Sequence, residues 1–159
     1  ARVLDGGQGA VRAVGFGGGH APSAAALTAS IAGFRTALFA PPAAFPPGRT
    51  AALLQGSIDL LSDLDVWPAL ALRAAPLRAI RIIDGTRRLI RAPEVTFHSS
   101  EIGLPAFGFN IPNGELVDAL HRHAEAFQRL TLISDKVEHV AFSERSAQLG
   151  AAGGSYEAR

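Results

Sequence analysis

The chain has 159 residues, of which 48% are hydrophobic and 18% are charged, and its formal net charge at pH 7 is +1. These values fit one globular domain with a buried core, and such a small net charge argues against a nucleic-acid partner. Cysteine is absent, which excludes disulfides and thiolate metal sites and is consistent with the cytoplasm, and no apolar run is long enough to span a bilayer.

The first part of the chain predicts a βαβ unit with parallel strands. Residues 1–10 are rich in glycine and lack an apolar period, so a flexible leader is expected there. A short apolar strand over 11–16 is followed by three glycines, by a helix of small residues over 21–32 that ends at Gly33, and by a second strand over 35–40. A strand, a glycine turn, a helix and another strand within about thirty residues are typical of a βαβ unit.

The next segment predicts a single helix. Four prolines make 41–48 irregular. Apolar residues near helical spacing then predict a helix from Arg49 to about Asp63, followed by a turn near Trp67 and Pro68.

An antiparallel hairpin is predicted after this helix. Two alternating segments, 77–83 and 88–92, are joined through Asp84 and Gly85, a dipeptide that favours tight hairpin turns. Five arginines interleave with the apolar residues, and this alternation indicates the solvated face of a hairpin in preference to a binding patch. These arginines are Arg78, Arg81, Arg87, Arg88 and Arg91.

The last part of the chain predicts a second α/β segment followed by a meander. A strand is expected over 107–111, an amphipathic helix over 113–128 with Asn113 as its cap, and a further strand over 130–133. The strands of the meander are expected over 136–142, 147–149 and 155–158.

The glycine turn is the main candidate for chemistry. Bare backbone at Gly17, Gly18 and Gly19 would let phosphates approach, and the helix that follows offers free N–H donors and the positive end of its dipole. Gly17 and Gly19 match the dinucleotide pattern G-x-G-x-x-G, but Pro22 stands at the position of the third glycine. Ala40 stands where an acidic residue would accept the ribose hydroxyls. A turn with a purely structural role is the alternative interpretation.

Three longer segments carry a more specific signal than the turn alone. They are GGGHAPSAAALTASIAGFRTALFAP over 17–41, GRTAALLQGSIDLLSDLDVW over 48–67 and FGFNIPNGELVDAL over 107–120. In this order they resemble the FAD-dependent monooxygenases of ubiquinone biosynthesis, which are relatives of para-hydroxybenzoate hydroxylase. The resemblance runs from about residue 11 to the carboxyl end.

The resemblance implies an α/β, Rossmann-like FAD-binding fold of the glutathione-reductase type, with an antiparallel hairpin and meander, of which 11–159 would be a truncated domain. It implies FAD as the cofactor, NAD(P)H as the reductant of the flavin, and O2 as the source of the oxygen delivered to an aromatic ring. An aromatic or polyprenyl-phenol compound would be the substrate, and the complete enzyme would be at most peripheral to a membrane.

The resemblance also assigns residues to the cofactor. They are Gly17, Gly18, Gly19, Ala21, Arg49, Gln55 and Val137. The four residues at the turn would lie against the FAD pyrophosphate, Arg49 and Gln55 would reach its phosphate and ribityl side, and the main chain of Val137 would border the adenine. In the alternative, Arg49 only begins a helix and Val137 is an ordinary core residue. The family's Asp-Gly flavin motif and substrate sheet would follow the last residues, so no catalytic residue is expected and the chain alone is expected to be inactive.

Other candidate sites are weaker. His121 and His123 are two apart on a predicted helix and point in different directions, which indicates solvated histidines rather than a metal site. Ser99 and its neighbours up to Glu101 lack the motif of a catalytic serine and predict a turn.

A rival interpretation is a non-catalytic Rossmann-like module, in which Pro22 and Ala40 mark a lost cofactor site. An exposed sheet edge would then serve association, including self-association. A third interpretation is that the isolated chain does not fold stably.

Overall fold

A three-stranded parallel sheet lies at the centre of the fold in the computed structural model, which describes residues 2–3, 11–42, 45–88 and 91–158. Its strands are β2 (Ala13–Phe16), β3 (Thr36–Phe39) and β9 (Leu130–Ile133), in the order β2-β3-β9. All four residues of β3 are buried, as expected for a parallel strand that is covered on both faces. The predicted βαβ unit is therefore confirmed.

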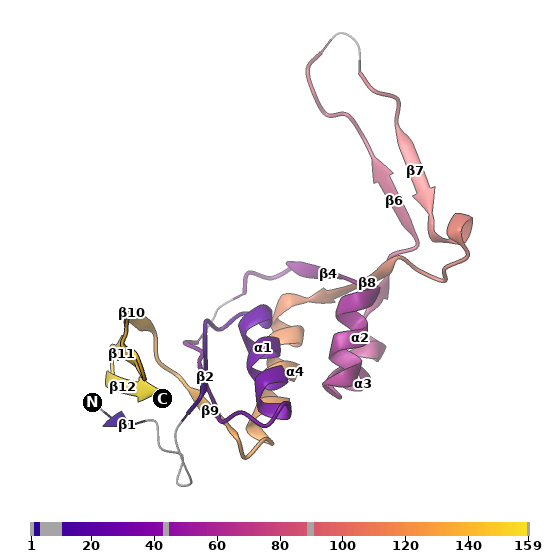
Figure 1. The fold of residues 1–159 in the computed structure, drawn as a ribbon. Coiled ribbons are helices and arrows are strands. Elements are labelled where there is room, and N and C mark those ends of the chain that lie inside the picture. Colours follow the sequence, from indigo (N-terminus) through magenta and orange to yellow (C-terminus); the bar gives the residue numbers. More distant parts are fainter. Residues whose placement is uncertain (1, 4–10, 43–44, 89–90, 159) are drawn as a thin grey trace.

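Helices cover one face of this sheet and a meander covers the other (Figure 1). Helix α1 (His20–Ile31) and helix α4 (Asn113–Glu125) pack against Leu38 of β3, whereas Phe39 contacts the meander. The ring centroids of Phe39 and Tyr156 lie 5.0 Å apart, edge to face. Adjacent residues of one strand thus enter two separate cores, and the body has three layers.

The predicted meander is confirmed and has one additional strand. It consists of β10 (Val137–Phe142), β11 (Ala147–Ala151) and β12 (Gly154–Ala158), which pair antiparallel in that order. Strand β1 (Arg2–Val3) pairs parallel with β12, so part of the predicted leader is a strand. Residues 4–10 of that leader lie outside the described residues.

The prediction of a helix beginning at Arg49 is wrong. Strand β4 (Thr50–Leu54) comes first and pairs with β8 (Gly108–Pro112), which also pairs with β5 (Ala75–Pro76). Helix α2 (Gln55–Asp63) begins only after this strand. The spacing of the apolar residues is compatible with a helix and with a strand, and the pairing with β8 makes this segment a strand.

Further short elements follow α2. Helix α3 (Trp67–Leu70) and the 3-10 turn η1 (Ala71–Arg73) replace the predicted turn, because Pro68 is tolerated in the first turn of a helix. The guanidinium of Arg73 donates two hydrogen bonds of 2.8 Å to the carboxylate of Glu115, which fastens η1 to α4 and raises the pKa of Arg73.

The hairpin is present, but its predicted register is wrong. Strand β6 (Ala79–Ile82) pairs with β7 (Val95–His98), and the last residue of β6 faces the first residue of β7. The predicted second strand over 88–92 is therefore a loop where it is described, and 89–90 lie outside the described residues. The carboxylate of Asp84 accepts the N–H groups of Thr86 at 2.9 Å and Ala92 at 3.1 Å, so it organises a wide loop instead of a tight turn.

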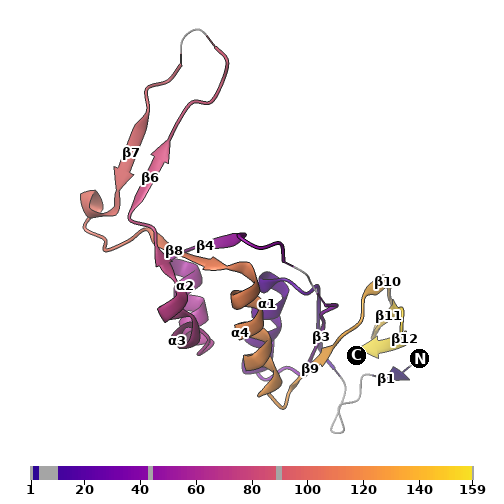
Figure 2. The same cartoon turned by 180° about the vertical axis from the view of Figure 1, so that it is seen from behind.

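All residues of both hairpin strands are exposed, which confirms the prediction of a solvated hairpin. The hairpin stands away from the layered body in two opposite views (Figures 1 and 2). The turn predicted after it is the 3-10 turn η2 (Ser99–Ile102), in which the Glu101 carboxylate accepts the N–H of His98 at 3.2 Å.

Asn113 is not the cap of α4. Pro112 occupies the capping position, and the Asn113 side-chain oxygen is buried without a hydrogen-bond partner among the described residues. The N–H of Asn113 donates to the Arg49 carbonyl at 3.0 Å, so it prolongs the β4–β8 pairing up to the first residue of the helix. Within the described residues, no helix is both long and apolar enough to cross a membrane.

Candidate cofactor site at the glycine turn

The turn between β2 and α1 has the backbone geometry that the sequence predicts. Gly17 has a φ of +116°, a conformation that residues with side chains rarely adopt. Its N–H donates a hydrogen bond of 2.8 Å to the carbonyl of Phe39, the last residue of β3. The turn therefore lies at the carboxyl edge of the parallel sheet, where open α/β sheets bind their ligands.

The turn is open at Gly19. This residue occupies the capping position of α1, and a Cβ built on it would meet no heavy atom of the described residues within 4 Å. The N–H groups of His20 and Ala21, the first residues of the helix, have no acceptor within the helix. Together with the positive end of the helix dipole, this open backbone suits an anionic ligand such as a diphosphate.

Pro22 is accommodated without interrupting the helix. It is the third residue of α1, where an N–H would have no acceptor within the helix. Its Cγ would lie 3.3 Å from a Cβ built on Gly17, so the ring covers Gly17 and not Gly19. The proline ring thus crowds only one side of the turn.

Close packing between β2 and α1 comes from Gly15, a residue that the sequence analysis missed. A Cβ built on Gly15 would lie 3.0 Å from Leu38 Cδ1 and 3.5 Å from the Pro22 carbonyl oxygen. In the dinucleotide pattern the third glycine provides this close approach from the helix. Here the glycine belongs to the strand, two residues before the turn, and no known spacing pointed to it.

Two further residues missed by the sequence analysis connect the turn to α4. The hydroxyl of Ser23, which is fully buried, donates to the Gly19 carbonyl at 2.9 Å and lies 3.1 Å from His121 Nε2. The prediction that His121 and His123 are solvated is wrong. Both are half-buried, and the His123 ring packs 5.2 Å from the ring of Phe127. No group of three or more metal-ligating side chains occurs among the described residues.

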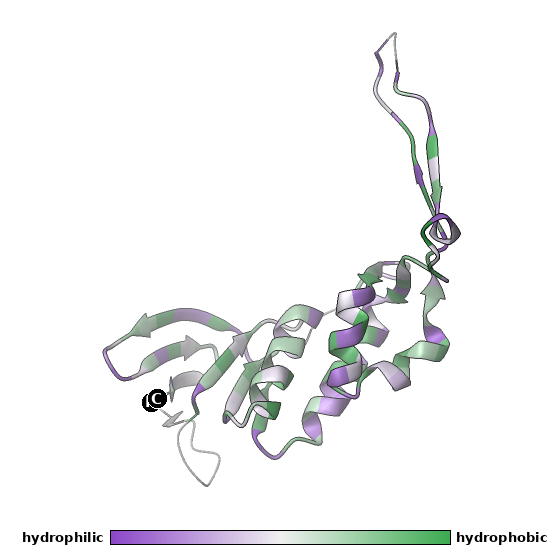
Figure 3. Cartoon of the chain, turned by 45° about the vertical axis from the view of Figure 1, so that its right-hand side comes forward, coloured by the Kyte–Doolittle hydropathy of each residue, from purple (hydrophilic) through white to green (hydrophobic). Residues whose placement is uncertain are grey.

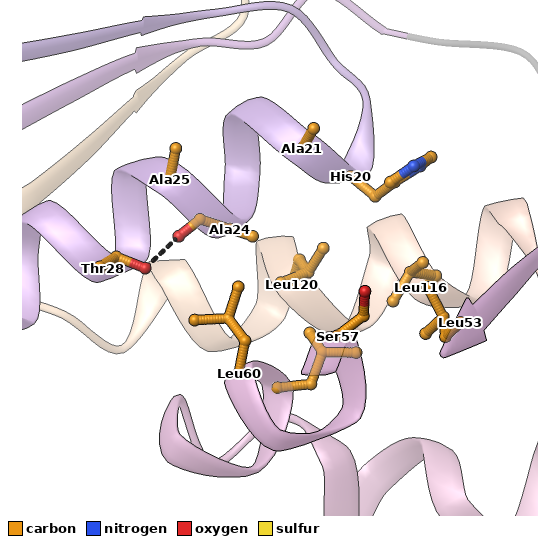
Figure 4. A pocket seen from close by; sticks show the side chains of 11 residues that line it. His20, Ala21, Ala24, Ala25, Thr28, Leu53, Ser57, Leu60, Leu116 and Leu120 are labelled. Carbon is orange, nitrogen blue, oxygen red and sulfur yellow. Dashed lines mark hydrogen bonds between the residues drawn. The ribbon is translucent and has the colours of Figure 1, made fainter. Parts of the chain in front are cut away.

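The amino terminus of α1 also borders an apolar hollow of about 300 Å³ (Figure 4). Helices α1, α2 and α4 and strand β4 line it, and the close-up shows His20 of α1 on one side and Leu53 and Ser57 on the other. The first turn of α1 and residues on both sides of the junction of β4 with α2 therefore border a common hollow. Gln55, predicted as a cofactor residue, is the first residue of α2 at this junction.

The remaining predicted cofactor residues lie on different elements. Arg49 precedes β4, is exposed, and forms no ion pair within the described part of the chain. The Gln55 amide donates a hydrogen bond of 2.7 Å to Asp59 Oδ1. Val137 begins β10 and packs in the core on the opposite face from α1, shortly after the carboxyl end of β9. Ala40, buried at the end of β3, leaves that position without a carboxylate.

Comparison with known proteins gives these features a family context. No protein-family model matches the chain. It is 32% identical over 124 residues to the 3-demethoxyubiquinol 3-hydroxylase of Escherichia coli (strain K12), a match that covers 73% of this chain and 30% of that protein.

Solved structures have the same fold at low sequence identity. The p-nitrophenol 4-monooxygenase PnpA from Pseudomonas putida DLL-E4 superposes with a TM-score of 0.72 at 14% identity, over 99% of this chain and 39% of its own. The flavin-dependent monooxygenase PieE, solved with FAD and substrate, gives 0.73 at 18% identity, over 93% of this chain and 29% of its own. The chain thus spans about a third of the length of these relatives. It is a distant homologue of the FAD-dependent monooxygenases and has the α/β fold of their amino-terminal FAD-binding part.

Proposed function

We propose that this chain is the FAD-binding part of a flavin-dependent hydroxylase of the ubiquinone-biosynthesis type, acting on an aromatic ring or a polyprenyl phenol. The carrying observation is the turn from Gly17 to Gly19, which lies between a parallel strand and the amino terminus of α1 and is open at Gly19. The 32% identity to a ubiquinol hydroxylase supports the substrate class. When bound, FAD would supply the redox chemistry, with NAD(P)H and O2 as co-substrates of the complete enzyme.

The chain's own residues would bind and orient the cofactor. Gly19 and the first N–H groups of α1 would hold the diphosphate, and Ala21 would lie beside it. Arg49 would add a positive charge with several donors to the phosphate side, since its guanidinium has no ion pair in the described residues. Gln55 would reach the ribityl side, and the main chain of Val137 would border the adenine.

The fit is better at the diphosphate than at the ribose. Ala40 offers no acceptor to the ribose hydroxyls, and the ring of Pro22 narrows the approach over Gly17. We therefore expect weaker binding of FAD than an acidic residue at position 40 would give. Changing Ala40 to Glu should strengthen FAD binding if the ribose lies at the end of β3.

Gly19→Ala provides the direct test. Its Cβ enters open space, so the fold should persist, but the methyl group would occupy the place proposed for the diphosphate. Flavin fluorescence should be quenched by the parent chain, and Gly19→Ala should weaken binding by about tenfold or more, equivalent to about 1.4 kcal/mol.

Gly114→Ala is the matched control. Gly114 lies in the first turn of α4, and a Cβ there also meets no heavy atom of the described residues within 4 Å. This variant should bind FAD like the parent. The cofactor proposal fails if the parent does not quench flavin fluorescence at high protein concentration, or if both glycine variants bind FAD equally.

The rival function, a non-catalytic module that acts by association, predicts a different result. Its oligomers would form without FAD and would not respond to Gly19→Ala. Size-exclusion chromatography of the parent with and without FAD, run beside the flavin titration, separates the two functions: oligomers that form without FAD in a chain that does not quench flavin fluorescence favour the rival.

A further inference from the structure

A buried hydrogen-bond chain connects helix α4 to the glycine turn. Apart from His20 at its start, α1 consists of apolar and weakly polar residues (Figure 3). One of these, Ser23, is fully buried, and its hydroxyl donates to the Gly19 carbonyl at 2.9 Å while lying 3.1 Å from His121 Nε2. Hydrogen bonds in such an apolar setting are strongly coupled, because the local dielectric constant is low.

The two distances decide which atoms carry the hydrogens. A serine hydroxyl has one hydrogen, and a carbonyl oxygen only accepts. The hydrogen between Ser23 Oγ and the Gly19 carbonyl oxygen is therefore that of the serine. His121 Nε2 must then donate to Ser23 Oγ, so the neutral imidazole carries its hydrogen on Nε2. The chain runs from the imidazole through the hydroxyl to the carbonyl.

The Gly19 carbonyl belongs to the same peptide group as the His20 N–H. In a trans peptide these two groups point in opposite directions. The carbonyl points into α1, where it also accepts the N–H of Ser23 at 3.4 Å, and the N–H of His20 points out of the end of the helix. Donors at the carbonyl oxygen polarise the peptide group, which makes its N–H a stronger donor.

Pro22 increases the importance of this N–H. The first N–H groups of a helix are the usual donors to an anion at its start, but the third residue of α1 is a proline and has none. The N–H of Ser23 is already bound to the Gly19 carbonyl. Among the first four residues of α1, only His20 and Ala21 therefore have an N–H without an acceptor in the helix.

We propose that Ser23 and His121 are positioning residues for the diphosphate of the cofactor. The hydrogen-bond chain from α4 orients the peptide group between Gly19 and His20 and strengthens the His20 N–H as a donor to the anion. This inference rests on the proposed function, because FAD brings the diphosphate to the turn. Neither Ser23 nor His121 is among the residues that the resemblance assigns to the cofactor.

Ser23→Ala tests the chain at its centre. It removes the hydroxyl and should weaken FAD binding, followed by flavin fluorescence, by about three- to tenfold, the effect of one hydrogen bond. Ser30→Ala is the matched control, because Ser30 is buried in the same helix and its hydroxyl has no hydrogen-bond partner among the described residues. This control should bind FAD like the parent. A purely structural contact would instead lower the melting temperature of Ser23→Ala and leave its affinity for FAD unchanged.

Variants of His121 test the donor at the start of the chain. His121→Leu removes the Nε2–H and should weaken FAD binding by about twofold. His121→Gln keeps an N–H donor and should retain the parent affinity. In a chain that already carries Ser23→Ala, His121→Leu should have no further effect on FAD binding, because the two residues act through one another.

NMR spectra report on the chain without FAD. At alkaline pH, where histidine is neutral, the ring nitrogens of His121 should show the hydrogen on Nε2. The amide nitrogen and proton of His20 should shift upfield in Ser23→Ala and stay unchanged in Ser30→Ala, since only the first variant loses a bond to the Gly19 carbonyl. Inorganic pyrophosphate should move the His20 amide of the parent at a lower concentration than that of Ser23→Ala.

The outcomes separate this inference from the proposed function. Equal FAD binding by the parent and Ser23→Ala, or a His20 amide that does not respond to loss of the Ser23 hydroxyl, would overturn the inference alone. A pyrophosphate response that depends on Ser23, in a chain that does not quench flavin fluorescence, would support the inference and overturn the proposed function. A parent that binds neither FAD nor pyrophosphate would overturn both.

Discussion

Strands β3 and β6 have the same length and comparable apolar character, but their surroundings are opposite. Every residue of β3 is buried, from Thr36 at 1% exposure to Phe39 at 0%. Every residue of β6 is exposed, and Ile82 retains 58% of its surface. The difference lies in what covers each strand: helices and a meander enclose β3, whereas no described element covers β6. Burial thus depends on the neighbours that the fold supplies and not on the strand itself.

The largest expected effect comes from removing a phenylalanine ring in each of the two regions. Phe39→Ala removes a fully buried ring that packs against Tyr156, and should lower the free energy of unfolding by about 3–5 kcal/mol. Phe97→Ala removes a ring that is 45% exposed, and should cost about 1 kcal/mol or less.

Urea unfolding monitored by the fluorescence of Trp67, the single tryptophan, measures both values. Equal losses for the two variants would show that the hairpin is covered in solution.

A second test concerns how closely backbones approach each other. A Cβ built on Gly108 would overlap the Leu53 carbonyl in the β4–β8 pairing, so Gly108→Ala must shift one of these strands. We expect a destabilisation of about 1–3 kcal/mol from this overpacking. Gly85→Ala, in the hairpin loop, meets no heavy atom of the described residues within 4 Å and should leave the melting temperature unchanged. Similar melting temperatures for both variants would argue against the β4–β8 register.

Elements that depend on local patterns were predicted well. The glycine turn, α1 and β3 follow one another within a short stretch, and each has its own signal: three glycines, a run of small residues and an apolar strand. The meander likewise follows from alternation along the chain. In the candidate site, the same local signals identified Gly17 and Gly19 at the turn.

Features that depend on distant partners were not predictable. Thr50 to Leu54 is a strand because β8, more than fifty residues later, pairs with it. Likewise, Asp84 and Gly85 suggested a tight turn, but β7 pairs further along the chain. The contact between Ser23 and His121 spans 98 residues. Gly15 matters for the close packing of β2 and α1 only because Leu38 and the Pro22 carbonyl lie against it, and no pattern within β2 shows these contacts.

The smallest expected effect concerns the loop at the tip of the hairpin, and it depends on pH. Hydrogen bonds from the N–H and then the side chain of Thr86, followed by the N–H of Ala92, lower the pKa of the Asp84 carboxyl below its ordinary value. A carboxylate with a lowered pKa in the folded state stabilises its loop fully above the pKa of the unfolded chain, about 3.9, and loses that contribution as pH falls through the lower folded value.

We therefore expect the loop to loosen in acid while the layered body stays folded. The amide signals of Thr86 and Ala92 should shift together in NMR spectra as Asp84 becomes protonated, and their hydrogen exchange should lose protection in the same range. Asp84→Asn keeps one acceptor oxygen but cannot titrate, so its two amides should show no such transition. Asp84 does not contribute to the layered body. A global unfolding transition with the same midpoint as the Asp84 titration would therefore mean that the hairpin and the body do not behave as separate regions.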